Sequence, residues 1–397
     1  MIKGEVKLKN PEIFSDVGEF SEEKAKKALE RATGRVEKLL NKFSDNLIKP
    51  AQRTNTYEAT DKVSWTTGMG TALYWLAYEY TGNKKFKDAA EKQCELYMET
   101  AEKKIGLIDH DIGFKFLPSL VAQYKITGNE RAKKAAIIAA DEMLEHVCPV
   151  NHFIIRDGKG NEGDPLTWYR SLVDSMMNIP LFFWAHQETG DKKYLDAAVN
   201  HYRETVKYLI REDGSSYHHY QYDLKTRKPL YGLTFQGHAD DSCWSRGHSW
   251  LVYGFPIAFS YTKNDEIPPI FEAVSNYFLN NLPDDFVPYW DLCFTTGSLE
   301  PRDSSAGAIV ACGLLEMCKY IPSDSPKHHI YKNAAYKLVN ALIDKCEQTG
   351  DNTDGIIGHV VGAKPQGLSI DTIATYGDFF YMEALMRILK PDFRMYW

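Results

Sequence analysis

Apolar residues recur along most of this chain at the three- and four-residue spacing of α-helices, and the first such segment is the clearest. It follows Ser21, which suits a helix N-cap, and the acidic residues Glu22 and Glu23, which suit a first helical turn. The apolar positions of this segment are Ala25, Ala28, Leu29, Ala32, Val36, Leu39, Leu40, Phe43 and Leu47. They lie on one side of a helix, so the pattern predicts a one-sided helix of about seven turns that reaches Leu47.

A short motif, Thr-Gly followed by Asn or Asp, recurs between the periodic segments. Its copies are Thr81-Gly82-Asn83, Thr127-Gly128-Asn129 and Thr189-Gly190-Asp191. Gly adopts the left-handed conformation after a helix most cheaply, and Asn or Asp can cap the next helix, so each copy predicts the turn of a helical hairpin. Degenerate copies at residues 261–265 and 320–324 make five such signals, and together with the first helix they indicate about six helical pairs.

Such hairpins can stack as an open solenoid or close into a double-layered ring. The connections between them vary in length and are rich in aromatic and charged residues, which is typical of loops that line one mouth of a barrel. One of these connections, residues 157–168, is too rich in glycine to be helical. We therefore expect an all-α fold in which six hairpins form a double-layered ring, with short β-hairpins in the mouth loops. We expect a single domain that spans residues 1–397.

Composition and charge exclude several classes of protein. The hydrophobic fraction of 44% and the charged fraction of 25% are typical of globular domains, and a net charge of −7 offers no basic stripe for nucleic acid. The chain begins without the apolar core of a signal peptide, and no stretch approaches the ~20 apolar residues of a membrane helix. We therefore expect a cytoplasmic protein with no nucleic-acid or membrane partner. Its seven scattered cysteines contain no Cys-x-x-Cys pair, which argues against a disulfide framework and a zinc site.

Two aspartates stand in surroundings that suggest chemistry. Asp174 lies in the apolar run Leu-Val-Asp-Ser-Met-Met, where burial should raise the pKa of its carboxyl group and make a general acid. Asp111 lies beside Asp109 and His110 and should ionise more easily, so the two carboxyl groups could divide the roles of acid and anion. Both could instead be helix caps or satisfied buried acids. We favour function for the pair, because perturbed acids cluster at functional sites.

A second segment, residues 217–250, mixes aromatic residues with His, Gln, Arg and Gly after a predicted β-hairpin. The indoles of Trp244 and Trp250 suit the apolar face of a sugar ring, and the guanidinium of Arg246 suits a carboxylate. Arg246 and Trp250 are four residues apart, so a helix that began there would place both on one face. A single Trp is more often part of a core, but this grouping favours a binding site.

Three runs of the sequence resemble the unsaturated glucuronyl hydrolases of glycoside hydrolase family 88. They are residues 110–114, 174–180 and 234–250, and the similarity extends over nearly the whole chain, including residues 376–385. The resemblance implies an (α/α)6 barrel that needs no metal or nucleotide cofactor. It also implies a substrate, the 4,5-unsaturated uronic acid that polysaccharide lyases leave at the non-reducing end of glycosaminoglycan-type oligosaccharides.

The same resemblance implies roles for individual residues. Asp174 matches the proton donor of the family, and Asp111 matches a second essential carboxylate, which is either nucleophile-like or only orienting and charge-stabilising. The positions expected around the sugar are Trp65, His110, His218, Gly232, Thr234, Gln236, Trp244, Arg246, Trp250 and Tyr376. In the implied mechanism Asp174 protonates C4 of the vinyl ether and water adds at C5, which differs from the direct attack on the glycosidic bond of ordinary glycosidases.

Substrate preference and several alternatives remain open at this point. Family members that prefer sulfated disaccharides carry an Arg near the Gln236 position and a motif with Ser and Lys before the last helix, where this chain has residues 360–367. We therefore expect weakly sulfated or unsulfated substrates. The alternatives are an unsaturated rhamnogalacturonyl hydrolase, a sugar epimerase that uses paired histidines such as His218 and His219, and a helical-repeat scaffold for a protein partner. We expect a monomer or a homodimer.

Overall fold

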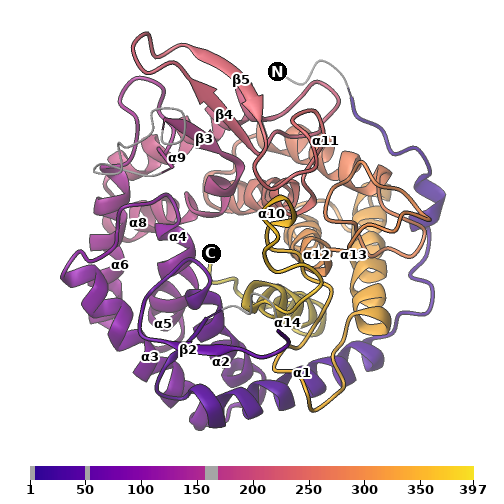
Figure 1. Cartoon of the computed structure of the whole chain (residues 1–397), viewed down its shortest axis with the longest axis horizontal. Helices are drawn as coiled ribbons and strands as arrows, with labels where there is room; N and C mark the ends of the chain where they lie inside the picture. The colour runs from indigo at the N-terminus through magenta and orange to yellow at the C-terminus, as the bar shows by residue number, and fades with distance from the viewer. Residues whose placement is uncertain (1–4, 50–53, 157–168) are drawn as a thin grey trace.

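The helices of this protein form two concentric layers. We describe residues 5–49, 54–156 and 169–397 of a computed structural model, so the predicted loop at residues 157–168 lies outside the described part. The inner layer consists of α2 (Thr67–Thr81), α4 (Ile112–Phe116) continued by η2 (Leu117–Val121) and α5 (Ala122–Thr127), α8 (Pro180–Thr189), α10 (Ser245–Thr262), α12 (Ser304–Cys318) and α14 (Thr375–Leu389). The outer layer consists of α1 (Glu22–Phe43), α3 (Lys84–Glu102), α6 (Glu130–Leu144), α9 (Lys192–Glu204), α11 (Ile267–Asn280) and α13 (Pro326–Lys345). Figure 1 shows the ring from one end.

Burial separates the two layers. Every residue of α12 except Leu315 is buried, which is typical of a helix enclosed on all sides. The outer helix α1 buries one face only, as the spacing of its apolar residues predicts. The last inner helix, α14, packs against the first, α2, and so closes the ring. The structure therefore confirms the predicted (α/α)6 barrel.

The predicted hairpin turns have the expected backbone. Gly82, Gly128 and Gly190 end α2, α5 and α8 with φ values of 71°, 73° and 74°. The side chain that follows each glycine caps the next helix by accepting a hydrogen bond from its first turn. At the degenerate copy, Lys263 takes the left-handed position after α10 with a φ of 52°.

The first helix begins where predicted and ends earlier. The Ser21 side chain accepts a hydrogen bond from the backbone N–H of Lys24 at 3.2 Å, which confirms the N-cap. The helix ends at Phe43, and Leu47 instead opens the short strand β1 (Leu47–Lys49), which pairs with β2 (Glu58–Thr60). The intervening Ser-Asp-Asn sequence explains the difference, because these side chains compete with the helix for backbone hydrogen bonds.

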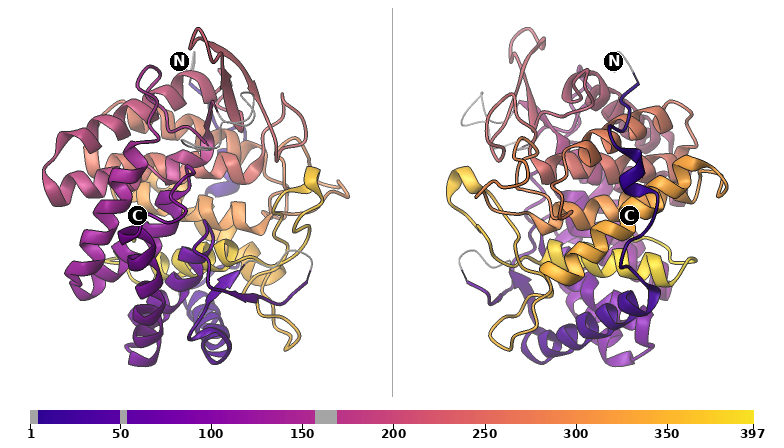
Figure 2. Two further views of the ribbon diagram at one scale, coloured as in Figure 1. Left: turned by 60° about the vertical axis from the view of Figure 1, so that its left-hand side comes forward. Right: turned by 90° about the vertical axis from the view of Figure 1, so that its right-hand side faces the viewer.

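A three-stranded antiparallel sheet lies at one mouth of the ring. Its strands are β3 (Arg170–Leu172), β4 (His219–Tyr222) and β5 (Pro229–Leu233), so the predicted hairpin after residue 217 is confirmed. Short 3-10 or π-helical turns complete the elements: η1 (Pro11–Phe14), η3 (Val173–Met177), η4 (Thr205–Leu209) and η5 (Lys364–Gln366). Figure 2 shows the β4–β5 hairpin and the loop near residue 360 on the same side of the barrel.

Two observations bear on the expectations drawn from composition. Within the described residues, which include all seven cysteines, no two cysteines are bonded to each other. In the same part of the chain we find no helix with the length and apolar character needed to cross a membrane.

Candidate active site

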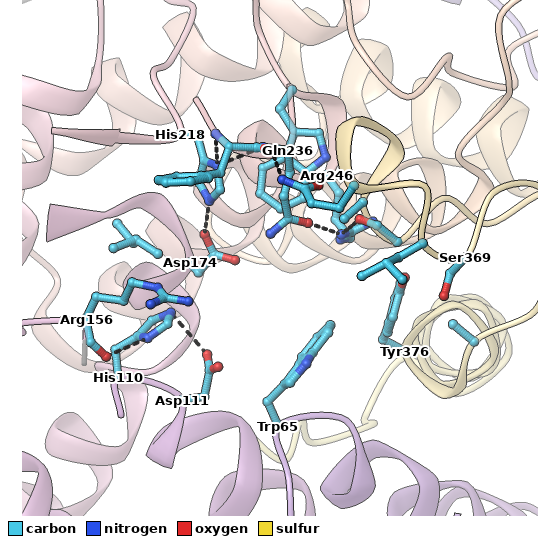
Figure 3. A pocket seen from close by; sticks show the side chains of 18 of the residues that line it. Trp65, His110, Asp111, Arg156, Asp174, His218, Gln236, Arg246, Ser369 and Tyr376 are labelled. Atoms are coloured by element: carbon cyan, nitrogen blue, oxygen red, sulfur yellow. Dashed lines mark hydrogen bonds and ion pairs between the residues drawn. The ribbon is translucent and has the colours of Figure 1, made fainter. Parts of the chain in front are cut away.

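A cavity of about 650 Å³ opens at the mouth of the ring that carries the three-stranded sheet. It is lined by Trp65, His110, Asp111, Arg156, Arg170, Leu172, Asp174, His218, Phe235, Gln236, Trp244, Arg246, Gly362, Ala363, Gln366, Leu368, Ser369, Ala374 and Tyr376. Asp111 and Asp174 come from different segments and face the same space, each beside a histidine (Figure 3). The fold thus brings the two predicted carboxyl groups together.

Nine of the twelve residues predicted for the site line this cavity, and three do not. Gly232 lies on β5, where a Cβ atom would stand 2.3 Å from the ring of Tyr217. Thr234 is occupied in shaping its loop, since its hydroxyl accepts a hydrogen bond from the backbone of Gly237 at 2.8 Å. The indole of Trp250 is buried behind the cavity wall, with its centroid 5.2 Å from that of Phe114.

Other lining residues were not singled out from the sequence. Phe235 lies inside a run that carries the family resemblance, in which only its neighbours Thr234 and Gln236 match positions expected around the sugar. Gly362, Ala363 and Gln366 lie in the 360–367 segment, which was compared from the sequence only with a motif for sulfated substrates, and Leu368 and Ser369 follow it. Arg156 and Arg170 flank the glycine-rich segment 157–168 and had no distinguishing local pattern. A signal was present only for Phe235, as an aromatic residue among polar ones.

Asp174 lies on η3, the turn that joins β3 to α8. Its side chain is only 14% exposed, and its Oδ2 lies 3.6 Å from Nε2 of His218. Burial raises the pKa of the Asp174 carboxyl group, against the opposing charges of His110 and Arg246. The direction of this shift agrees with the prediction from its apolar sequence and suits a group that must carry a proton.

The tautomer of His218 follows from its hydrogen bonds. Its Nδ1 accepts from the backbone N–H groups of Phe235 and Gln236 at 3.1 and 3.3 Å, so the ring proton must reside on Nε2. Burial holds the pKa of His218 well below its usual value, so the ring is neutral. Its Nε2–H therefore points toward Asp174 and can stabilise the carboxylate once Asp174 has given up its proton.

Asp111 lies beside His110 on the opposite side of the cavity. Nδ1 of His110 lies 3.1 Å from the carbonyl oxygen of Arg156, to which it donates, so Nε2 faces Oδ1 of Asp111 at 3.3 Å. Burial, partly offset by His110, raises the pKa of Asp111 to about 6. The expectation that Asp111 ionises easily is therefore wrong, because the fold removes water from a carboxyl group whose sequence neighbours are polar.

Arg246 joins the loops of the mouth and does not present a free fork. Its Nη2 donates to Gln236 Oε1 at 2.9 Å and to the carbonyl oxygen of Gly362 at 2.6 Å. Its Nη1 donates to the carbonyl oxygen of Val361 and lies 3.2 Å from Oδ2 of Asp303, which is fully buried. The guanidinium thus fixes Gln236 and the 361–362 backbone relative to each other.

Aromatic rings form the remaining walls. The ring of Trp65, from the loop before α2, stacks on that of Tyr376, at the start of α14, with centroids 5.1 Å apart. The guanidinium of Arg246 lies over the ring of Trp244, 4.6 Å from its centroid. Trp244 itself is 3% exposed. Rings beside buried carboxyl groups suit a ligand with both apolar and hydroxylated faces, as sugars have.

The described residues offer no group of three or more His, Cys, Asp or Glu side chains arranged to hold a metal ion. The absence of a cofactor remains a prediction from the sequence.

Comparisons with known proteins agree with this geometry. The pattern of Glycosyl Hydrolase Family 88 matches residues 37–386. The unsaturated chondroitin disaccharide hydrolase of Streptococcus pneumoniae is 38% identical over 392 residues, which cover 98% of each chain. The crystal structure of unsaturated glucuronyl hydrolase from Streptococcus agalactiae superposes with a TM-score of 0.94 at 35% identity, covering 99% of this chain and 98% of that one. An aspartate-to-asparagine mutant of that enzyme, complexed with dGlcA-GalNAc6S, has a TM-score of 0.88 at 34% identity and covers both chains fully. This chain therefore belongs to glycoside hydrolase family 88.

Proposed function

We propose that this enzyme releases the 4,5-unsaturated uronic acid from the non-reducing end of glycosaminoglycan-type oligosaccharides made by lyases. The observation that carries the proposal is the position of Asp174, a buried carboxyl group of raised pKa inside the cavity, next to a neutral His218. Hydration of an enol ether needs an acid that can give a proton to carbon, and burial favours the protonated form of Asp174. The substrates named for the relatives from S. pneumoniae and S. agalactiae support this choice.

The proposed reaction begins with proton transfer from Asp174 to C4 of the double bond. Positive charge then develops at C5 and the ring oxygen, where a negative charge on Asp111 would stabilise it. Water adds at C5 and returns its proton to Asp174, which stays close to the Nε2–H of His218. The resulting hemiketal opens, and the rest of the saccharide leaves.

The experiment uses the ultraviolet absorbance of the conjugated double bond, which disappears on hydration. We expect the wild type to consume unsaturated chondroitin or hyaluronan disaccharide, and Asp174→Asn to lower kcat by about 10²–10⁴-fold, which is what a general acid contributes. Asp265→Asn, at an exposed site, is the control for loss of one charge. Full activity in folded Asp174→Asn would show that another group is the acid.

We further propose that weakly sulfated or unsulfated substrates are preferred. Phe235, which is 44% exposed, presents an apolar ring to the cavity. Lys364 does not line the cavity; its Nζ is bonded to Glu300 and lies 5.0 Å from the ring centroid of Trp290. We expect a higher kcat/KM for the unsulfated disaccharide than for its 6-sulfated form, and the reverse order would contradict this preference.

The same assay separates the alternative activities. Activity on unsaturated rhamnogalacturonyl disaccharide and on no glucuronyl substrate would favour an unsaturated rhamnogalacturonyl hydrolase. Interconversion of sugars without loss of absorbance would favour an epimerase. The membership in a family of hydrolases gives no support to a scaffold without catalytic activity. The cytoplasmic location and the monomeric or homodimeric state stay predictions.

A further inference from the structure

The start of helix α4 is capped in an unusual way. Asp111 occupies the N-cap position, where an aspartate normally accepts a hydrogen bond from the N–H of the second or third helical residue. Here the Asp111 side chain accepts no such bond. Its carboxyl group lines the cavity instead, with Oδ1 3.3 Å from Nε2 of His110 (Figure 3).

Asn178 provides the acceptor that Asp111 does not. Its Oδ1 accepts a hydrogen bond at 2.8 Å from the backbone N–H of Phe114, the third residue of α4. Its Nδ2 donates to the backbone oxygen of Asp174 at 3.2 Å. The side chain is completely buried. One amide group thus bonds to both segments that carry the predicted catalytic carboxyl groups.

Glycine contacts keep this amide in place. A Cβ atom on Gly113 would stand 2.4 Å from Cα of Asn178, so α4 touches the backbone that follows η3. A Cβ atom on Gly254 of α10 would stand 2.8 Å from the carbonyl oxygen of Met176, on η3 itself. The segment with Asp174 and Asn178 is therefore held between two inner helices, and it has little room to shift.

We propose that Asn178 is a positioning residue that caps α4 in place of Asp111 and so leaves the Asp111 carboxyl group facing the substrate. An uncapped helix start leaves N–H groups without partners, and a good cap stabilises a helix by about 1 kcal/mol. Without Asn178, the Asp111 carboxylate is the N-cap group next to the Phe114 N–H. Rotation toward that N–H would take it away from His110 and from the cavity.

Such a rotation would change the titration of Asp111. The charged and titratable groups that face it are His110, Asp109 and Lys115 from its own segment and Asp174 from η3. A carboxylate that accepts hydrogen bonds from backbone N–H groups is favoured in its charged form. The pKa of Asp111 should therefore fall when it caps the helix.

Two substitutions separate the capping role from the bond to Asp174. Asn178→Ala removes both hydrogen bonds, whereas Asn178→Asp keeps an acceptor for the Phe114 N–H. We expect Asn178→Ala to lower kcat by about ten-fold or more, with little change in KM, and to move the acidic limb of the pH profile to lower pH. Asn178→Asp keeps the cap and adds a negative charge, which can only raise the pKa of Asp111, so in this variant the acidic limb should not move to lower pH. Equal profiles for the two variants would contradict the proposal.

Asn276 provides a matched control. It is also buried, on α11, where its Nδ2 donates to the backbone oxygen of Val6 and its Oδ1 accepts from the hydroxyl of Tyr331. Asn276→Ala should lower the free energy of unfolding without moving the pH profile. A shifted profile in this variant would mean that the profile reports stability and not the position of Asp111.

A crystal structure of Asn178→Ala tests the geometry directly, without reference to activity. We expect an Asp111 oxygen within hydrogen-bond distance of the Phe114 N–H. If the alanine variant does not fold, the structure of Asn178→Ser provides the same test. An Asp111 that still faces His110 would overturn the proposal. The kinetic experiment rests on the proposed function, so a wild type inactive on every unsaturated uronyl substrate would refute that function. The crystal structure would still show which side chain caps α4.

Discussion

Asp111 should destabilise this protein at neutral pH, and Asp111→Asn should relieve the effect. The pKa of this carboxyl group is about 6 in the folded chain, mainly because of burial, while an unfolded aspartate titrates near 3.9. A group whose pKa is raised on folding contributes stability below its unfolded pKa and loses that contribution as the pH rises through its folded pKa. The penalty is therefore absent below about pH 4 and complete above about pH 6.

The magnitude follows from the difference between the two pKa values. About two pKa units correspond to about 3 kcal/mol, and the side chain is only 20% exposed, so solvent screens little of this. Asparagine has nearly the same shape and cannot ionise. We expect Asp111→Asn to raise the free energy of unfolding by about 3 kcal/mol at pH 8 and by almost nothing at pH 4.

Urea unfolding at a series of pH values, followed by circular dichroism, measures this difference. Asp265→Asn removes the same charge from an exposed position and should change stability little at any pH. A stabilisation of Asp111→Asn that is equal at pH 4 and pH 8 would show that its origin is not ionisation. A loss of stability at pH 8 would mean that the folded carboxylate is favoured, by His110 or otherwise, and would refute the reasoning.

Two further predictions concern backbone contact and buried charge. Gly113→Ala places a Cβ atom 2.4 Å from Cα of Asn178 and should abolish activity and lower Tm, whereas Gly34→Ala on α1, where nothing lies within 4 Å, should stabilise by about 1 kcal/mol. Calorimetry of both variants checks this, and an unchanged Tm for Gly113→Ala would contradict it. Arg246→Ala leaves Asp303 buried without its ionic partner and should cost about 3–5 kcal/mol, part of which Asp303→Asn restores in the double variant. Urea unfolding of the single and double variants measures both effects. A double variant no more stable than Arg246→Ala would mean that the charge of Asp303 does not cause the loss of stability.

Much of the fold could be predicted from local patterns. The Thr-Gly-Asn/Asp turns specify helix ends and starts through the left-handed glycine and the capping side chain, and both effects act over a few residues. The end of α1 was predicted less well. Apolar spacing continues to Leu47, but the Ser-Asp-Asn sequence before it ends the helix, and tertiary contacts place Leu47 in a strand.

The site divides in the same way. The apolar run around Asp174 predicted a raised pKa for its carboxyl group, and burial in the fold raises that pKa. The polar run around Asp111 predicted easy ionisation, but burial in the fold raises the pKa of this carboxyl group to about 6. Arg246 was predicted as a carboxylate binder, but its partners Val361 and Gly362 are more than a hundred residues away.

The sequence by itself determined the helical hairpins, their turns, and the chemical groups available at the mouth, because spacing, capping and residue type are local properties. The tertiary structure alone decided that α14 closes the ring on α2 and that Trp250 lies behind the cavity wall while Phe235 lines it. It also decided that Asn178 caps the helix of Asp111. Burial and hydrogen-bond partners arise from segments distant in the chain, so the pKa values and the orientation of the carboxyl groups are properties of the assembled barrel.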